Sequence, residues 1–238
     1  MATFVLIHGS FLAGYSWRGV RPLLRAAGHE VFTPSLTGLG ERSHLATPEV
    51  GLETHIQDVV NVLFYEDLND VILVGHSYGG MVVTGAADRV SERIGKLVYL
   101  DAFAPRDGES IRDLERSSGA GPEAAAPEPV GWLIPPMTVY RSGQSEVSEE
   151  MAWLAARRSQ QPRKTFEDGI HLTGAVDTLP RTYIYCRQSA PGDMFGQFAR
   201  RAKSEAGWRY LEIDGNHVAL ITAPEEVSTM LLKVAAPD

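Results

Sequence analysis

The chain is poor in cysteine, in basic charge and in long apolar runs. Its single cysteine, Cys186, allows no intrachain disulfide, so a reducing compartment such as the cytoplasm is expected. The 22 Lys and Arg residues face 30 Asp and Glu, a formal net charge of −8, which disfavours a nucleic-acid partner and a polybasic membrane anchor. The apolar run Thr3–His8 is too short for a signal peptide, and no stretch approaches the roughly 20 apolar residues of a membrane span. We therefore expect a cytoplasmic protein with no nucleic-acid or membrane partner.

Short apolar segments alternate with helical patterns along the chain. A hydrophobic fraction of 44% permits a sizeable core, and 238 residues suit one α/β domain with an insertion. Val71–Val74 is apolar at every position, which is typical of a parallel strand covered by helices on both faces. The sequence predicts an α/β fold with about six mostly parallel strands and helices on both faces. The predicted strands are Thr3–His8, Glu30–Pro34, Val71–Val74, Lys96–Leu100, Thr182–Cys186 and Arg209–Ile213.

Several predicted helices carry start or stop signals. Ser16 is a plausible N-cap for the first helix, and Gly28 is a plausible stop. The run Thr54-His55-Ile56-Gln57 fits a capping box, which predicts that the next helix begins at Thr54. A helix around Glu225–Val234 closes the chain. Strands and helices therefore follow each other as they do in an α/β domain.

The segment from residue 105 to residue 180 interrupts this alternation. It holds no clear strand, although Ser148–Arg158 predicts a helix. An irregular insertion of this length in a compact domain is usually functional. We therefore expect residues 105–180 to form a cap, or lid, inserted into an α/β core of residues 1–104 and 181–238. The alternative is a disordered linker, mainly over Gly119–Pro129.

The pentapeptide Gly75-His76-Ser77-Tyr78-Gly79 matches the pattern G-x-S-x-G. It directly follows the predicted strand Val71–Val74 and directly precedes the helical run Met81–Thr84. A sharp turn between a strand and a helix exposes the serine hydroxyl, and the helix N-terminus behind it favours developing negative charge. This context predicts that Ser77 is a nucleophile; the alternative is a tight turn with an inert serine.

A serine nucleophile needs backbone N–H groups aimed at the oxygen that becomes negatively charged during attack. The residue after the nucleophile, Tyr78, supplies one predicted donor. The loop His8-Gly9-Ser10-Phe11-Leu12, after the first strand, supplies the other, and Ser10 is the best candidate. Phe11 and Leu12 would then line the substrate pocket. The histidine of this loop is expected to hydrogen-bond the loop rather than to transfer a proton.

A general base must come from a loop near the nucleophile. His217 follows the last predicted strand, Arg209–Ile213, in the loop Asp214-Gly215-Asn216-His217. A neutral imidazole at this position can take the Ser77 proton and return it to the leaving group. The alternative is a surface histidine with no catalytic role.

At His8-Gly9, Gly28-His29, Gly75–Gly80 and Gly215–His217, the chain resembles the α/β-hydrolase fold family. More closely, it is similar to the group that contains plant methyl-salicylate-type esterases, plant hydroxynitrile lyases and bacterial carboxylesterases. The resemblance covers nearly the whole chain outside the proline-rich part of the cap. It implies an α/β-hydrolase fold with a Ser-His-Asp triad and the hydrolysis of a carboxylic ester. These motifs are specific for the fold and much less specific for the substrate.

The chain departs from this family in its triad acid. In the plant members an aspartate follows the penultimate strand, whereas Ser189 stands roughly at that position here. Asp101 directly follows the strand Lys96–Leu100 and keeps the chain order serine, acid, histidine. Asp193, later in the usual loop, is the second candidate. Asp101 is preferred, with a purely structural turn-capping role as its alternative.

The leading hypothesis is a carboxylic ester hydrolase that forms an acyl-enzyme. The expected ligand is a small to mid-sized hydrophobic ester, which includes aromatic esters and lactones. A homodimer is left open. His, Cys and Asp do not cluster at metal-ligand spacings, so no metal and no organic cofactor is expected. Trp132 and Trp153 are the predicted substrate-binding residues of the cap. Other apolar cap residues that could share the pocket are Met137, Met151 and Phe166. The alternative is that about half of these five residues form the core of the cap.

Three other functions fit the same scaffold. A cyanohydrin lyase of this family carries a lysine after the base and a glutamate before the nucleophile, where this chain has Val218 and His76. A ligand receptor would bind tightly and turn over slowly. A cofactor-free cyclase or decarboxylase of a biosynthetic pathway would use the same pocket. Assays with acyl p-nitrophenyl esters, methyl esters and lactones discriminate among these functions.

Overall fold

The computed structural model describes residues 1–121, 124–137, 148–188 and 192–236. Within these ranges, the main sheet has six strands in the order β2-β1-β3-β4-β7-β8, and every neighbouring pair is parallel. The predicted α/β class and all six predicted strands are confirmed. The strands are β1 (Thr3–Ile7), β2 (Glu30–Phe32), β3 (Val71–His76), β4 (Ile94–Leu100), β7 (Arg181–Cys186) and β8 (Trp208–Ile213).

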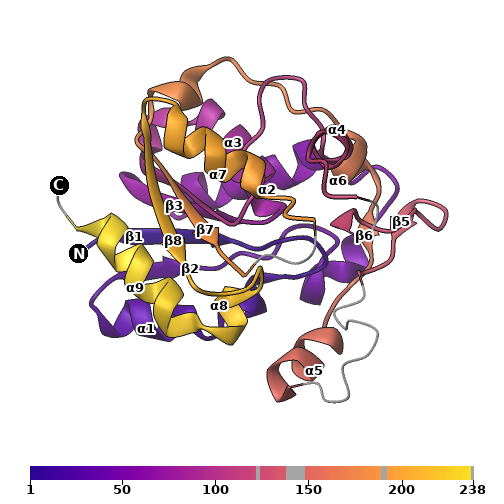
Figure 1. Cartoon of the computed structure of the whole chain (residues 1–238), viewed down its shortest axis with the longest axis horizontal. Coiled ribbons are helices and arrows are strands. Elements are labelled where there is room, and N and C mark those ends of the chain that lie inside the picture. The colour runs from indigo at the N-terminus through magenta and orange to yellow at the C-terminus, as the bar shows by residue number, and fades with distance from the viewer. Residues whose placement is uncertain (122–123, 138–147, 189–191, 237–238) are drawn as a thin grey trace.

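Helices cover both faces of the sheet (Figure 1). Alternate residues of each strand enter opposite cores: Val5 and Ile7 of β1 pack on one side, and Phe4 and Leu6 on the other. Both sets are fully buried, which explains why β1 is apolar at every position from Phe4 to Ile7. One face carries α2 (Leu52–Tyr65), α3 (Gly79–Arg89) and α7 (Gly196–Ser204), and the other carries α1 (Val20–Ala26), α8 (Ala219–Thr222) and α9 (Pro224–Ala235).

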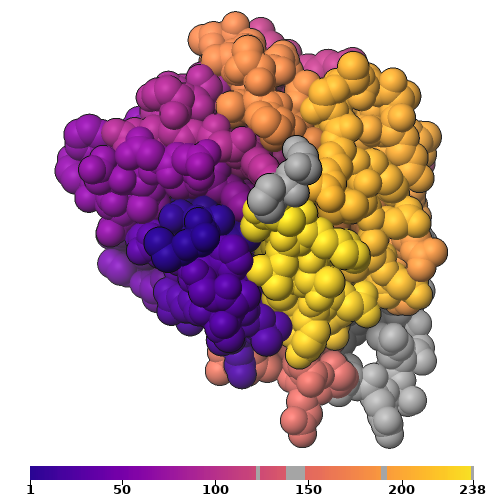
Figure 2. Space-filling view, turned by 90° about the vertical axis from the view of Figure 1, so that its left-hand side faces the viewer, coloured from indigo at the N-terminus to yellow at the C-terminus, as the bar shows by residue number. Residues whose placement is uncertain are grey.

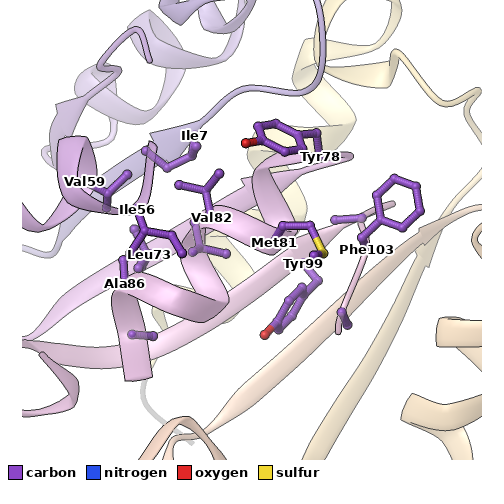
Figure 3. Packing of buried hydrophobic residues seen from close by; sticks show 14 of the residues in the cluster. Ile7, Ile56, Val59, Leu73, Tyr78, Met81, Val82, Ala86, Tyr99 and Phe103 are labelled. Atoms are coloured by element: carbon purple, nitrogen blue, oxygen red, sulfur yellow. The ribbon is translucent and has the colours of Figure 1, made fainter. Parts of the chain in front are cut away.

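The core on the α2–α3 side reaches the end of β3, where the predicted nucleophile lies. Ile56 of α2 and Val82 of α3 pack beside Leu73 of β3, and Tyr78 and Phe103 lie at one end of the same cluster (Figure 3). Each of these side chains is at most 6% exposed. The turn after β3 therefore packs against a tightly packed core.

The opposite core joins the two ends of the chain. Phe4 and Leu6 near the N-terminus share a buried cluster with Val227 and Leu231 of α9. The space-filling view shows the first residues of the chain beside the C-terminal helix on one face of the molecule (Figure 2). The sheet edge that carries the carboxyl ends of the strands lies away from this face, next to the inserted elements (Figure 1).

Between β4 and β7 the chain leaves the main sheet. Contrary to expectation, this segment contains strands: Leu133 pairs with Pro162 and Ile134 with Gln161 in a short antiparallel ladder. Strands of two residues carry no periodicity, so the sequence pattern did not reveal them. The division into a core and a cap stays a prediction. The elements are α4 (Ile111–Ser117), β5 (Leu133–Ile134), α5 (Glu149–Ala155), β6 (Gln161–Pro162), α6 (Lys164–Glu167) and a 3₁₀ turn at Ala175–Thr178.

Two predicted helix starts were wrong. The first helix begins after Gly19, and Ser16 is buried in a separate 3₁₀ turn, Gly14–Trp17. The second helix, α2, begins after Gly51, so Thr54 lies in its first turn and accepts a hydrogen bond from the Gly51 N–H at 3.3 Å. Among the described residues, no helix combines the length and the apolar composition needed to cross a membrane.

Candidate active site

Ser77 lies in the turn between β3 and α3, in a left-handed backbone conformation with φ +54°. The glycines on either side are required by close contacts. A Cβ on Gly75 would lie 2.6 Å from the Gly79 carbonyl oxygen, and a Cβ on Gly79 would lie 2.7 Å from the carbonyl oxygen of His8. Any larger residue would therefore push the turn away from β1. This geometry leaves the Ser77 hydroxyl at the end of the sheet, with 9% of the residue exposed.

Three side chains that are far apart in the sequence meet at this turn. The Ser77 hydroxyl lies 3.0 Å from Nε2 of His217, and Nδ1 of His217 lies 2.7 Å from Oδ2 of Asp101. Because the carboxylate can only accept, Nδ1 carries the proton and Nε2 is free to accept the hydroxyl proton. About a third of the His217 side chain is exposed, whereas Asp101 is completely buried. The chain of two hydrogen bonds can therefore pass a proton from the serine to the histidine.

Asp101 follows β4 directly and is held on both sides of its carboxyl group. Its Oδ1 accepts the Cys186 N–H at 3.2 Å, and its own N–H donates to the Ile184 carbonyl at 2.8 Å. The other candidate acid, Asp193, instead accepts hydrogen bonds from the Tyr185 hydroxyl and from a nearby backbone amide. The expectation about Ser189 falls outside the described residues.

Two further rings hold the imidazole of His217, and sequence reasoning had given neither of them a role. Phe195 stacks on it with the ring centres 4.6 Å apart and the planes 9° from parallel. His76 lies at 4.8 Å and donates a hydrogen bond from Nε2 to the His217 carbonyl oxygen at 2.7 Å. Burial holds the pKa of His76 well below its ordinary value, so this ring stays neutral. Nothing in the spacing of Phe195 signals its contact.

The two candidate amide donors belong to Ser10, in the loop after β1, and to Tyr78, which directly follows Ser77. Within the described residues, neither the Ser10 N–H nor the Tyr78 N–H donates a backbone hydrogen bond. His8 behaves as expected for a structural histidine: Nδ1 bonds the Gly9 carbonyl at 2.9 Å and Nε2 accepts the Leu36 N–H at 3.1 Å. Burial lowers the pKa of His8 to about 4. Both amides are therefore available to an incoming oxygen atom.

The predicted pocket residues have different surroundings. Phe11 and Leu12 are buried beside the Ser10 amide, with 2% exposure each. Trp153, on α5, instead has its ring between the guanidinium groups of Arg18 and Arg157, at 4.4 and 4.5 Å. Trp132 is half-buried. In the described part of the chain, neither tryptophan makes a ring contact with the aromatic residues beside His217, so their substrate-binding role stays a prediction.

No metal-binding cluster of three or more His, Cys, Asp or Glu residues occurs among the residues that the structure describes. The reactive groups brought together here are a hydroxyl, an imidazole, a carboxylate and the backbone amides of Ser10 and Tyr78, which are unpaired within the described part of the chain. Together they suit nucleophilic attack on a carbonyl carbon, with the negative oxygen held by the amides.

Known proteins share both this sequence and this fold. The chain is 38% identical over 243 residues to the carbendazim hydrolyzing esterase of Nocardioides sp. (strain SG-4G), covering 97% of this chain and 98% of that protein. It is 35% identical over 253 residues to salicylic acid-binding protein 2 of Nicotiana tabacum, covering 98% and 96%. An extracellular alpha/beta-hydrolase from a Paenibacillus species superposes with a TM-score of 0.79, at 26% identity over 98% of each chain.

These similarities extend over the sheet, the inserted elements and the turn that carries Ser77. They confirm the predicted α/β-hydrolase fold and the group of relatives that the motifs indicated. Residues 4–229 match the description "Alpha/beta hydrolase family". Since that match spans nearly the whole chain, the protein belongs to the alpha/beta hydrolase family.

Proposed function

We propose that this protein is a carboxylic ester hydrolase in which Ser77 is the nucleophile, His217 the general base and Asp101 the acid that orients it. The observation that carries the proposal is the hydrogen-bond chain from the Ser77 hydroxyl through His217 to Asp101, at 3.0 and 2.7 Å. It has the geometry that a general base needs in order to take the proton during attack. The esterase name of the full-length relative from Nocardioides supports the same class of reaction.

The proposal assigns each step of the reaction to one of these groups. Nε2 of His217 takes the hydroxyl proton while Oγ of Ser77 bonds to the ester carbon, and the carbonyl oxygen becomes negative. The Ser10 and Tyr78 N–H groups donate to that oxygen. The imidazolium then protonates the alkoxide as the C–O bond breaks, so the alcohol leaves and an acyl-serine remains. Water, deprotonated by His217, attacks the acyl carbon, and Ser77 regains its proton as the acid leaves.

The surroundings of His217 support a hydrophobic ester as the substrate. Phe195 covers one face of the imidazole, and Phe103 packs edge-on against Phe195 with ring centres 5.1 Å apart. Both phenylalanines are less than 10% exposed, so the wall beside the base is apolar. We propose a small to mid-sized hydrophobic ester, with aromatic esters and lactones included. The predicted contributions of Trp132 and Trp153 belong to this proposal.

The substitution Ser77→Ala tests the proposal directly. Removing the nucleophile of a triad should lower kcat by at least about 10⁴-fold, because the residual rate comes from the amides and from binding alone. The matched control is Ser204→Ala, which removes an exposed hydroxyl at the end of α7. Both variants are assayed with p-nitrophenyl esters, methyl esters, lactones and carbendazim. A Ser77→Ala variant with the rate of the control refutes the mechanism.

The same assays separate the proposed function from the lyase hypothesis. Val218 and His76 replace the lysine and the glutamate of that hypothesis, and burial holds the pKa of His76 well below its ordinary value. A neutral His76 offers no positive charge to hold cyanide. Cyanide release from mandelonitrile should therefore not exceed the uncatalysed rate, and release well above it would favour the lyase.

A further inference from the structure

One short stretch of the inserted segment, Gln161–Phe166, contacts residues at both candidate amide donors. It contacts Phe11, which follows Ser10, and it contacts Tyr78 itself. It contains β6, the start of α6 and the connection between them. Its polar side chains, Gln161 and Thr165, are completely buried, and Phe166 is 2% exposed. Buried polar side chains are retained where each of their hydrogen bonds is made, so their partners indicate what they hold in place.

Gln161 holds the loop that carries Ser10. The Phe11 N–H donates to Oε1 of Gln161 at 2.8 Å, and the Phe11 carbonyl accepts the Ser159 N–H at 3.0 Å. Phe11 has φ +64°, a left-handed conformation that favours glycine, and it occupies the third position of a turn closed by the Leu12 N–H and the Gly9 carbonyl. The turn therefore depends on outside contacts to keep this conformation.

Hydrogen bonds fix both of the peptide planes that flank Ser10. The Ser10 N–H shares a planar peptide unit with the Gly9 carbonyl, which accepts from His8 at 2.9 Å. The next peptide unit contains the Phe11 N–H, which Gln161 accepts at 2.8 Å. Since a residue's orientation is set by its two peptide planes, His8 and Gln161 together determine where the Ser10 N–H points.

The orientation of the Gln161 amide is itself fixed. Its Nε2 donates to Oγ1 of Thr165 at 2.8 Å, and Thr165 donates to the Pro162 carbonyl at 2.7 Å. With the NH₂ group committed to Thr165, Oε1 is left to face Phe11.

Aromatic packing completes the link to Tyr78. The Phe166 ring lies between the two donor segments: its centre is 6.0 Å from the Phe11 ring and 6.0 Å from the Tyr78 ring, which is parallel to it within 3°. The Tyr78 hydroxyl also donates to Nδ1 of His55 at 2.8 Å. The side chain of Tyr78 is therefore held by a hydrogen bond and by ring packing.

We propose that Gln161 is the positioning residue of the oxyanion hole: from the inserted segment, it fixes the Ser10 amide at the distance from the Tyr78 amide that the developing oxyanion requires. This inference rests on the proposed ester hydrolysis, because it assigns the two amides to that reaction. Gln161 does not touch the reacting atoms. It acts through Phe11, and Phe166 of the same stretch packs against Tyr78.

The test is Gln161→Met, which keeps the length of the side chain and removes both of its hydrogen bonds. Loss of one oxyanion donor costs about 10²- to 10³-fold in kcat, and a misplaced donor should cost about 10- to 100-fold. We expect this fall in kcat with KM within about twofold of wild type. The pH at which kcat/KM falls by half should not move, because His217 and Asp101 are untouched.

A second readout separates positioning from general damage. An ester and its thionoester, in which sulfur replaces the carbonyl oxygen, are compared as substrates. Sulfur is larger and accepts hydrogen bonds weakly, so an intact oxyanion hole favours the oxygen ester. In Gln161→Met this preference should shrink along with kcat. Equal losses for the two substrates, or an unchanged kcat, would overturn the inference.

Matched variants keep the test decisive. Gln160→Met makes the same change at an exposed neighbouring position and should leave both readouts unchanged. Thr165→Val frees the Gln161 amide to rotate, and it should produce a smaller shift in the same direction. If Gln161→Met fails to fold, Thr165→Val still tests whether Gln161 positions the Ser10 amide. Ser77→Ala distinguishes the two proposals: if that variant stays active, the proposed function fails, whereas a dead Ser77→Ala with a normal Gln161→Met rejects only the positioning role.

Discussion

Three buried histidines surround the turn that carries Ser77, and they should make the protein lose stability in mild acid. Burial lowers the pKa of His8 and of His55 to about 4, and it holds the pKa of His76 well below the ordinary value of 6.5. Between these values the unfolded chain binds protons that the folded protein does not. The free energy of unfolding is therefore highest above pH 6.5 and falls as the pH drops toward 4.

The size of the effect follows from the pKa values of His8 and His55. A histidine whose pKa falls from 6.5 to about 4 on folding contributes about 2 kcal/mol between pH 7 and pH 5. His8 and His55 together should therefore remove about 4 kcal/mol, and His76 adds to the loss. This is a large part of the roughly 5–15 kcal/mol that stabilises a typical domain. Glu115, whose pKa is raised by burial, acts in the opposite direction.

Urea unfolding followed by tryptophan fluorescence at several pH values between 5 and 7 measures this loss. The variant His55→Gln cannot take up the proton, so its stability should vary by about 2 kcal/mol less over the same range. His44→Gln, at an exposed position, is the control and should keep the wild-type dependence. A wild-type free energy of unfolding that changes by less than about 1 kcal/mol between pH 7 and pH 5 would refute the reasoning.

Three further outcomes are expected. Asp101→Asn should lower kcat by about 10⁴-fold with little change in thermal stability, because the amide can hold His217 in the wrong tautomer. Asp193→Asn should leave kcat within a few-fold in the same assay, since Asp193 bonds Tyr185 rather than the base; the reverse pattern would reassign the acid. Gly79→Ala should lower the free energy of unfolding by at least about 1–3 kcal/mol in urea, because the new Cβ meets backbone oxygens at 2.7 and 2.8 Å.

The sequence was informative where one local pattern has one structural meaning. Continuous apolar runs such as Val71–Val74 indicated central parallel strands, and the glycines around Ser77 indicated a turn with no room for side chains. The order of the chain placed His217 after the last strand. Each of these inferences needs only residues near one another in the sequence and the rule that ligands bind at the carboxyl ends of parallel strands.

The sequence was uninformative where a residue's role depends on a distant contact. Gln161 meets Phe11 across 150 positions, and its strand is two residues long, so neither periodicity nor composition marks it. Phe195 covers His217 without any motif. Thr54 led to a wrong prediction for a different reason. A threonine can cap a helix from the N-cap or from the third helical position, and here Gly51 is the N-cap and Thr54 is the third helical residue. Such ambiguities are resolved by packing rather than by propensity.

Backbone contacts hold Ser77 and Asp101, the proposed nucleophile and acid, at the ends of two adjacent strands. Both residues have positive φ, +54° and +42°, at the ends of the adjacent strands β3 and β4. Backbone bonds brace them: the Ser77 carbonyl accepts the Phe103 N–H at 3.1 Å, and the Asp101 N–H donates to β7. The sheet ladder thus continues past the ends of the strands and fixes the two groups relative to each other.

His217 is held by contacts outside the sheet, which suits the proton transfers proposed for it. It comes from the loop after β8, and its imidazole is about a third exposed. A ring contact with Phe195 and a hydrogen bond from His76 to its carbonyl limit its movement without bonding Nε2. In the proposed mechanism, Nε2 exchanges a proton with Ser77, with the leaving alcohol and with water, whereas the carboxylate of Asp101 keeps its one partner. His217, which changes partners in the proposed mechanism, is therefore the group that no hydrogen bond of the sheet holds.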